Sequence, residues 1–186
     1  MHNDLGQPLS AEISAGETAG AVELAAGDLP PAQAAFERSL AVLRRMGAHD
    51  YAATRAIQLA DVLYRRGRFD AAAREVEPAR SELAADDVGT QSRWRSVAAR
   101  LAAREGSVER ADELSLEALE TLEGTDGLNA QAQCLLDRAE VLSLSGRGED
   151  SAAAAIREAL RLYEQKENVV GAARARALLA ETAESP

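Results

Sequence analysis

The stretch from Leu59 to Val76, LADVLYRRGRFDAAAREV, contains the signals that decide the fold of this chain. Gly67 follows a run of helix-forming residues, and Asp70 lies at the start of a second run. A glycine in this position is typical of the left-handed residue that ends a helix. An acidic residue just after it favours the start of the next helix. The stretch therefore predicts two helices joined by a tight turn.

Turns of this kind recur along the chain at a nearly constant interval. The glycines are separated by 40, 39 and 40 residues: Gly27, Gly67, Gly106 and Gly146. A small residue lies seven positions before each of them: Gly20, Ala60, Ala99 and Ala139. After each glycine, three positions recur at a spacing of four and then three: Ala32, Phe36 and Ser39; Ala72, Val76 and Ala79; Ala111, Ser115 and Ala118; Ala152, Ile156 and Ala159. This spacing keeps the three positions on one helix face, so the pattern predicts one helical hairpin repeated four times.

The repeat resembles the tetratricopeptide repeat, whose second helix carries an A-x3-F pattern. Ala32 and Phe36 match that pattern directly, and Leu59-Ala60-x2-Leu63 resembles the L-G-x2-Y pattern of the first helix. The resemblance covers about residues 11 to 183. The period is about 40 residues instead of the usual 34, as in the long-helix arrays of bacterial signalling and regulatory proteins. The resemblance implies an all-α fold, a right-handed α-solenoid of about four hairpins with a C-terminal capping helix.

The repeat phase also places the individual helices. We expect first helices near 11–26, 50–66, 90–105 and 129–145, and second helices near 30–46, 70–85, 109–123 and 149–166. A ninth helix near 168–183 is expected to cap the stack. Residues 1–10 are expected to be a flexible tail. Because the connectors are too short to be linkers, residues 11–186 are predicted to form a single repeat domain.

Composition and charge narrow the classes of function. The 186 residues carry a net charge of −10, which disfavours binding to nucleic-acid phosphates and to anionic membranes. The chain has no apolar run long enough to span a membrane and no secretory signal at Met1, so a cytoplasmic protein is expected. Basic residues are almost all arginine, which together with the abundant alanine indicates a GC-rich bacterial genome.

Residues that could catalyse a reaction or bind a metal ion are few. The single cysteine, Cys134, lies in an apolar helical stretch and is expected to be a core residue. His2 and His49 lie in a tail and a turn, and neither has a second ligand at metal-binding spacing. Neither a serine-hydrolase elbow nor a phosphate-binding loop is present. We therefore expect no enzyme, no cofactor and no metal site.

Polar residues on the first helices are the candidates for partner binding. The resemblance implies that these helices line a concave surface where partners bind. The residues are Gln58, Asp61, Tyr64, Arg93, Arg100, Arg104, Gln133, Asp137 and Glu140. The three arginines are spaced to form one stripe, which would bind an acidic peptide or a C-terminal carboxylate. The alternative interpretation, which we favour, is that the neighbouring acids, Asp61, Asp137 and Glu140, already neutralise the stripe.

The sequence thus favours a non-catalytic protein–protein interaction module, a scaffold, adaptor or regulatory module that binds a partner protein or peptide. One alternative is a sensor of a signalling peptide or small ligand. Another is a self-assembling structural protein, with a homodimer formed by the terminal helix. Its apolar residues are Val169, Val170, Ala173, Ala177 and Ala180. The favoured expectation for these residues is that they pack back on the 149–166 helix.

Overall fold

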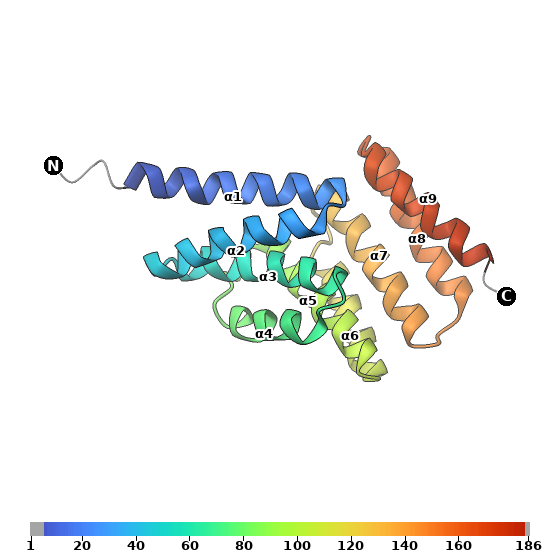
Figure 1. The fold of residues 1–186 in the computed structure, drawn as a ribbon. Helices are drawn as coiled ribbons and strands as arrows, with labels where there is room; N and C mark the ends of the chain where they lie inside the picture. The colour runs from blue at the N-terminus through green and yellow to red at the C-terminus, as the bar shows by residue number, and fades with distance from the viewer. Residues whose placement is uncertain (1–5, 185–186) are drawn as a thin grey trace. The chain divides into compact units, whose positions relative to one another are not determined.

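A computed structural model describes the backbone of residues 6–184 and the surroundings of the side chains of residues 13–148 and 150–182. Within residues 6–184 the chain forms nine α-helices and no strand, which confirms the all-α fold class (Figure 1). The helices belong to two compact units, Met1–Ala84 and Ala85–Pro186.

The first unit contains four helices, each packed on the next along the chain. They are α1 (Gly6–Ala26), α2 (Leu29–Met46), α3 (His49–Arg65) and α4 (Phe69–Arg80). The pairs α1–α2 and α3–α4 correspond to the first two predicted hairpins.

The second unit contains five helices. They are α5 (Val88–Arg104), α6 (Val108–Glu120), α7 (Leu128–Leu144), α8 (Glu149–Gln165) and α9 (Val169–Glu184). The hairpins α5–α6 and α7–α8 are joined by contacts of α7 with both α5 and α6, and α9 packs on α8. The first helices α5 and α7 therefore lie side by side.

The predicted turn glycines all have the left-handed backbone that their positions require. Their φ angles are 81° at Gly27, 72° at Gly67, 80° at Gly106 and 64° at Gly146. After α3, the amide of Gly67 donates to the carbonyl of Tyr64 at 2.8 Å, and the amide of Arg68 donates to that of Leu63 at 2.9 Å. These bonds satisfy carbonyls that the helix end leaves open.

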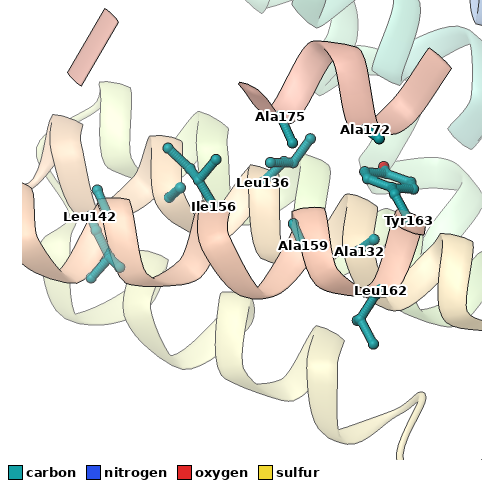
Figure 2. Close-up of a cluster of buried hydrophobic side chains, with 11 residues drawn as sticks. Ala132, Leu136, Leu142, Ile156, Ala159, Leu162, Tyr163, Ala172 and Ala175 are labelled. Carbon is teal, nitrogen blue, oxygen red and sulfur yellow. The ribbon is translucent and has the colours of Figure 1, made fainter. Parts of the chain in front are cut away.

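The repeated small residues form the seam between the helices of each hairpin. Ala60 and Ala99 are 0% exposed, and Ala139 is 4% exposed. At Gly20 a Cβ atom would lie 2.3 Å from Phe36 Cε1, so only glycine fits against that ring. In the second unit the seam of α7 and α8 merges with the inner side of α9 into one apolar cluster (Figure 2).

Two helix boundaries differ from the expected ones by five residues, more than any other boundary does. α1 begins at Gly6, so part of the expected tail is helical, while residues 1–5 lie outside the described chain. α4 ends at Arg80 instead of residue 85. Pro78 lies in its last turn and has no amide hydrogen to donate, and the Ser81 hydroxyl donates to the Pro78 carbonyl at 3.0 Å.

The terminal helix α9 does not use the expected residues to pack on α8. Ala172 and Ala175, which are 3% and 0% exposed, face α8, while Val169 and Val170 are 77% and 59% exposed. Ala173, Ala177 and Ala180 are exposed as well. The expectation that these five residues pack on the preceding helix is therefore wrong. The helical period places them on the opposite side from Ala172 and Ala175.

Candidate functional site

Of the three candidate residues on α3, Asp61 and Tyr64 are buried inside the first unit and Gln58 is partly buried. Asp61 and Tyr64 are each 4% exposed. Arg65 Nη2 lies 2.9 Å from Asp61 Oδ2, one helical turn away. The ring of Tyr64 packs against that of Phe69 with their centroids 5.2 Å apart. Of the three, only Gln58 is partly exposed, and it accepts a hydrogen bond from Arg55.

Arg55 is a buried cation that the sequence analysis did not single out. Its side chain is 4% exposed, and its Nη2 lies 2.9 Å from Glu17 Oε2 on α1. The guanidinium also lies over the ring of Phe36, 5.6 Å from the centroid. Glu17 and Phe36 belong to α1 and α2, so this arginine ties three helices of the first unit together. No sequence signal marks it, because its partners are 38 and 19 residues away.

The central arginine of the predicted stripe is also buried. Arg100 is 2% exposed, and its Nη1 lies 3.4 Å from Asp137 Oδ1 on α7. Its Nε donates to the carbonyl of Ser96 at 3.3 Å. Asp137 is 6% exposed and accepts a 2.8 Å hydrogen bond from Gln133 Nε2. The pair therefore holds α5 against α7 and offers little surface to a ligand.

The outer arginines of the stripe are more accessible. Arg104 Nη2 lies 3.1 Å from Glu140 Oε1, and the two side chains are 36% and 35% exposed. Arg93 is exposed at the other end of the stripe. The structure thus pairs Arg100 and Arg104 with two of the acids that the alternative interpretation named.

The helix α9 adds polar contacts to α7 on the same side as these pairs. Arg174 Nη1 donates to Gln133 Oε1 on α7 at 3.3 Å. Near the start of the helices, Asn168 Nδ2 donates to Asn129 Oδ1 at 3.0 Å. The helices α5, α7 and α9 therefore share one polar surface, called here the first-helix face. Its accessible or half-accessible members are Arg93, Arg104, Gln133, Glu140 and Arg174.

A separate pocket of about 260 Å³ lies in the first unit, between the end of α2, the start of α3 and the end of α4. Its floor is small and apolar, with Ala52, Ala56 and Ala79 among the lining residues. Glu82 and His49 stand at its rim, with Oε1 and Nδ1 3.7 Å apart. From the sequence, His49 is expected in a connector, and the pocket could not be predicted because three separate helices line it.

Cys134 is a core residue, as expected. Its side chain is 5% exposed, and burial raises the pKa of the thiol to about 11. The Ser96 hydroxyl lies 3.3 Å from its sulfur. At neutral pH the sulfur is therefore a protonated thiol, which is a poor nucleophile.

Neither a metal-ligand cluster nor a helix that could cross a membrane occurs in the part of the chain that the structure describes. No three His, Cys, Asp or Glu side chains there gather closely enough to hold a metal ion. None of the described helices combines the length and the apolar character that crossing a membrane requires.

Comparison with protein-family models finds no match to this chain, and a search of curated protein sequences finds no match either.

Proposed function

We propose that this chain is a tetratricopeptide-like protein, a right-handed α-solenoid of about four hairpins capped by α9, that binds a partner protein or peptide without catalysing a reaction. The in-register recurrence of the turn glycines and seam residues supports the repeat architecture. The role is that of a scaffold, adaptor or regulatory module in the cytoplasm of a bacterium. It calls for no cofactor, nucleic acid or membrane.

The observation that carries the proposal is the first-helix face of the second unit. A buried Arg100–Asp137 pair lies one helical turn from a half-exposed Arg104–Glu140 pair, and Arg93 is exposed two turns before Arg100 on α5. A buried pair fixes the helices that carry it, so the outer side chains are held in place before a partner arrives. A preorganised surface loses less conformational entropy on binding.

Arg93 and Arg104 are the residues that we expect to contact the partner. An acidic segment would place one carboxylate on Arg93 and another on Arg104, where it would compete with Glu140, whereas a C-terminal carboxylate would bind at one of these two positions. Arg100 acts in this scheme as a positioning residue, because its guanidinium is covered. The expected partner is therefore a protein or peptide with an acidic stretch.

The pocket of the first unit favours a second function, binding of a small ligand or the end of a signalling peptide. Its apolar floor and the His49–Glu82 rim would suit a small aliphatic group that also carries a polar end. A ligand-dependent rise in the melting temperature would reveal such binding.

The main test is affinity capture from a lysate of the source cell with the wild type and with an Arg93→Glu/Arg104→Glu variant. The matched control is Arg38→Glu/Arg157→Glu, which makes the same charge change at two exposed arginines outside the first-helix face. We expect a protein that the wild type and the control retain and that the face variant loses. Equal retention by all three would place the contact elsewhere, and no retained protein would contradict the interaction function.

A further inference from the structure

The outer face of α9 is an exposed helix surface with the character of a hairpin seam. We use the name outer face for Val170, Ala173, Ala177 and Ala180, which lie on the side of α9 that faces away from α8. Val170 is 59% exposed, and the adjacent Val169 is 77% exposed. Two exposed valines and three exposed alanines make an apolar strip, and the exposed charged residues Arg174, Arg176 and Glu181 lie elsewhere on the surface of the helix.

The outer face of α9 corresponds in the repeat to the side of α7 that packs on α8. A shift of 41 residues places Cys134 on Ala175, and both pack against the second helix of the preceding hairpin. The same shift places Ala132, Leu136 and Ala139 on Ala173, Ala177 and Ala180. In α7 these three residues are 0%, 4% and 4% exposed, because α8 covers them. α9 thus has the position of a first helix, and within the described residues its seam side is exposed.

The four complete hairpins show which residues a helix needs in order to pack on such a surface. Each second helix brings three seam residues at a spacing of four and then three, as Ala152, Ile156 and Ala159 do in α8. Ala173, Ala177 and Ala180 have the same spacing in α9. The α9 helix of a second copy therefore carries the seam pattern of a second helix, with residues small enough for close approach.

The charges beside the strip complement themselves in the same arrangement. Arg174 and Glu181 are seven residues apart and lie on the same flank of the outer face, since seven residues make two helical turns. In an antiparallel pair of identical helices related by a two-fold axis, equal flanks face each other. With the axis near Ala177, Arg174 of each copy lies opposite Glu181 of the other copy. The dimer therefore contains two equivalent Arg–Glu pairs.

We propose that the outer face of α9 joins two copies of this chain into a closed antiparallel dimer. Each α9 acts as the second helix for the hairpin of the other copy. Because the two-fold contact covers the outer faces of both copies, no outer face remains for a third copy and the assembly stops at two. One helix pair buries less than the ~1,200 Å² of a typical stable interface, so we expect a dimer that dissociates on dilution. The dimer contact shares Arg174 with the first-helix face, but the proposal does not depend on partner binding at that face.

The first test measures mass against concentration by sedimentation equilibrium, from low micromolar to near-millimolar protein. We expect the wild type to rise from the monomer mass to twice that mass and no further. Ala177→Glu places two carboxylates opposite each other at the axis and is expected to remain a monomer throughout. Its matched control, Ala154→Glu, changes an exposed alanine of α8 and is expected to dimerise as the wild type does. Circular dichroism should show equal helix content in all three, because both substituted positions are exposed in the monomer.

The second test uses charge reversal. Arg174→Glu alone and Glu181→Arg alone each set like charges opposite each other and are expected to weaken the dimer several-fold. The double variant Arg174→Glu/Glu181→Arg restores opposite charges and is expected to recover most of the wild-type affinity at low salt.

Several outcomes would overturn the proposal. A wild type that stays monomeric near millimolar concentration would leave the outer face to a different protein. Growth beyond two copies would rule out a closed pair. Equal dimerisation of Ala177→Glu and the wild type, or a double charge variant no better than the single ones, would place the contact on another surface.

Discussion

Gly20 shows how one missing methyl group sets the spacing of a hairpin. Its backbone approaches the ring of Phe36 so closely that a Cβ would lie 2.3 to 2.7 Å from three ring atoms. We expect Gly20→Ala to lower the free energy of unfolding by about 1–3 kcal/mol, despite alanine's higher helix propensity, because the ring or the helix must move. Urea denaturation followed by circular dichroism measures the change.

The other hairpins supply the control for this prediction. They combine an alanine at the seam with a smaller facing residue, as in Ala60 with Val76. In a Gly20→Ala/Phe36→Val variant the alanine has room, so the loss should be smaller than the sum of the two single losses. Gly89→Ala, where a Cβ meets only Asp87 Oδ1 at 3.6 Å, should cost little or nothing. Additive losses in the double variant would show that the Gly20 contact is not the cause.

Cys134 gives the fold a dependence on alkaline pH. Burial raises its pKa from 9.0 to about 11, so the folded state favours the neutral thiol more than the unfolded state does. This contribution is fully present below pH 9 and is lost as the pH rises toward 11. Relative to Cys134→Ala, the wild type should lose about 2 kcal/mol of stability across that interval. Parallel stability curves for the two proteins would contradict the assignment.

At the scale of the helix, Glu167 is an exception among the turns. It has a φ of 58° at the end of α8, while the corresponding turns after α2 and α6 have their left-handed residues at Gly47 and Gly124. A side chain in left-handed backbone costs about 1–2 kcal/mol, part of which glycine loses again through its freedom in the unfolded chain. We expect Glu167→Gly to raise the free energy of unfolding by roughly 0.5–1 kcal/mol. Gly106→Ala, where no neighbouring atom would meet the new Cβ, should lower it by about 1 kcal/mol.

A buried ion pair, Arg100 with Asp137, lies between α5 and α7. Asp137→Ala would leave the Arg100 guanidinium buried without its carboxylate, and we expect a loss of about 3–5 kcal/mol in urea denaturation. Glu140→Ala breaks the half-exposed pair with Arg104 and should cost less than about 1 kcal/mol. In Arg100→Met/Asp137→Leu no buried charge remains, so most of the stability should return. A double variant as unstable as Asp137→Ala would show that the charges themselves hold the helices together.

The turns and the seams could be predicted from the sequence, because each depends on a residue type that local geometry demands. Gly67 is needed where the backbone is left-handed, and Ala60 where a second helix comes close. The burial of Arg100 could not be predicted. An arginine gives the same pattern whether water or Asp137 lies opposite, and only the packing of α5 on α7 decides between them. Ala177 is similar, since alanine suits a buried seam and an exposed helix equally well.

At the scale of the whole molecule, the core of the second unit is made by its own helices. The cluster of α7, α8 and α9 is contained in Ala85–Pro186, and α5 and α6 pack on each other and on α7. In a repeat protein each hairpin is stabilised by its direct neighbours, so a unit with complete internal contacts can fold alone. We therefore expect a fragment of residues 85–186 to be helical and to unfold in one cooperative transition. Its urea m-value should be about half that of the full chain, in proportion to the surface exposed.

A shorter fragment separates internal packing from helix propensity. Residues 107–186 keep α6 to α9 but lack α5, so the seam residues Ala111 and Ala118, both 0% exposed in the full chain, lose their cover. We expect this fragment to unfold at a lower urea concentration than the 85–186 fragment, with less helix remaining before the transition. If the two fragments had equal midpoints, α5 would contribute nothing to the unit. If the 85–186 fragment were unfolded in buffer, its core would require the first unit, and the two units would have to be treated as one folding body.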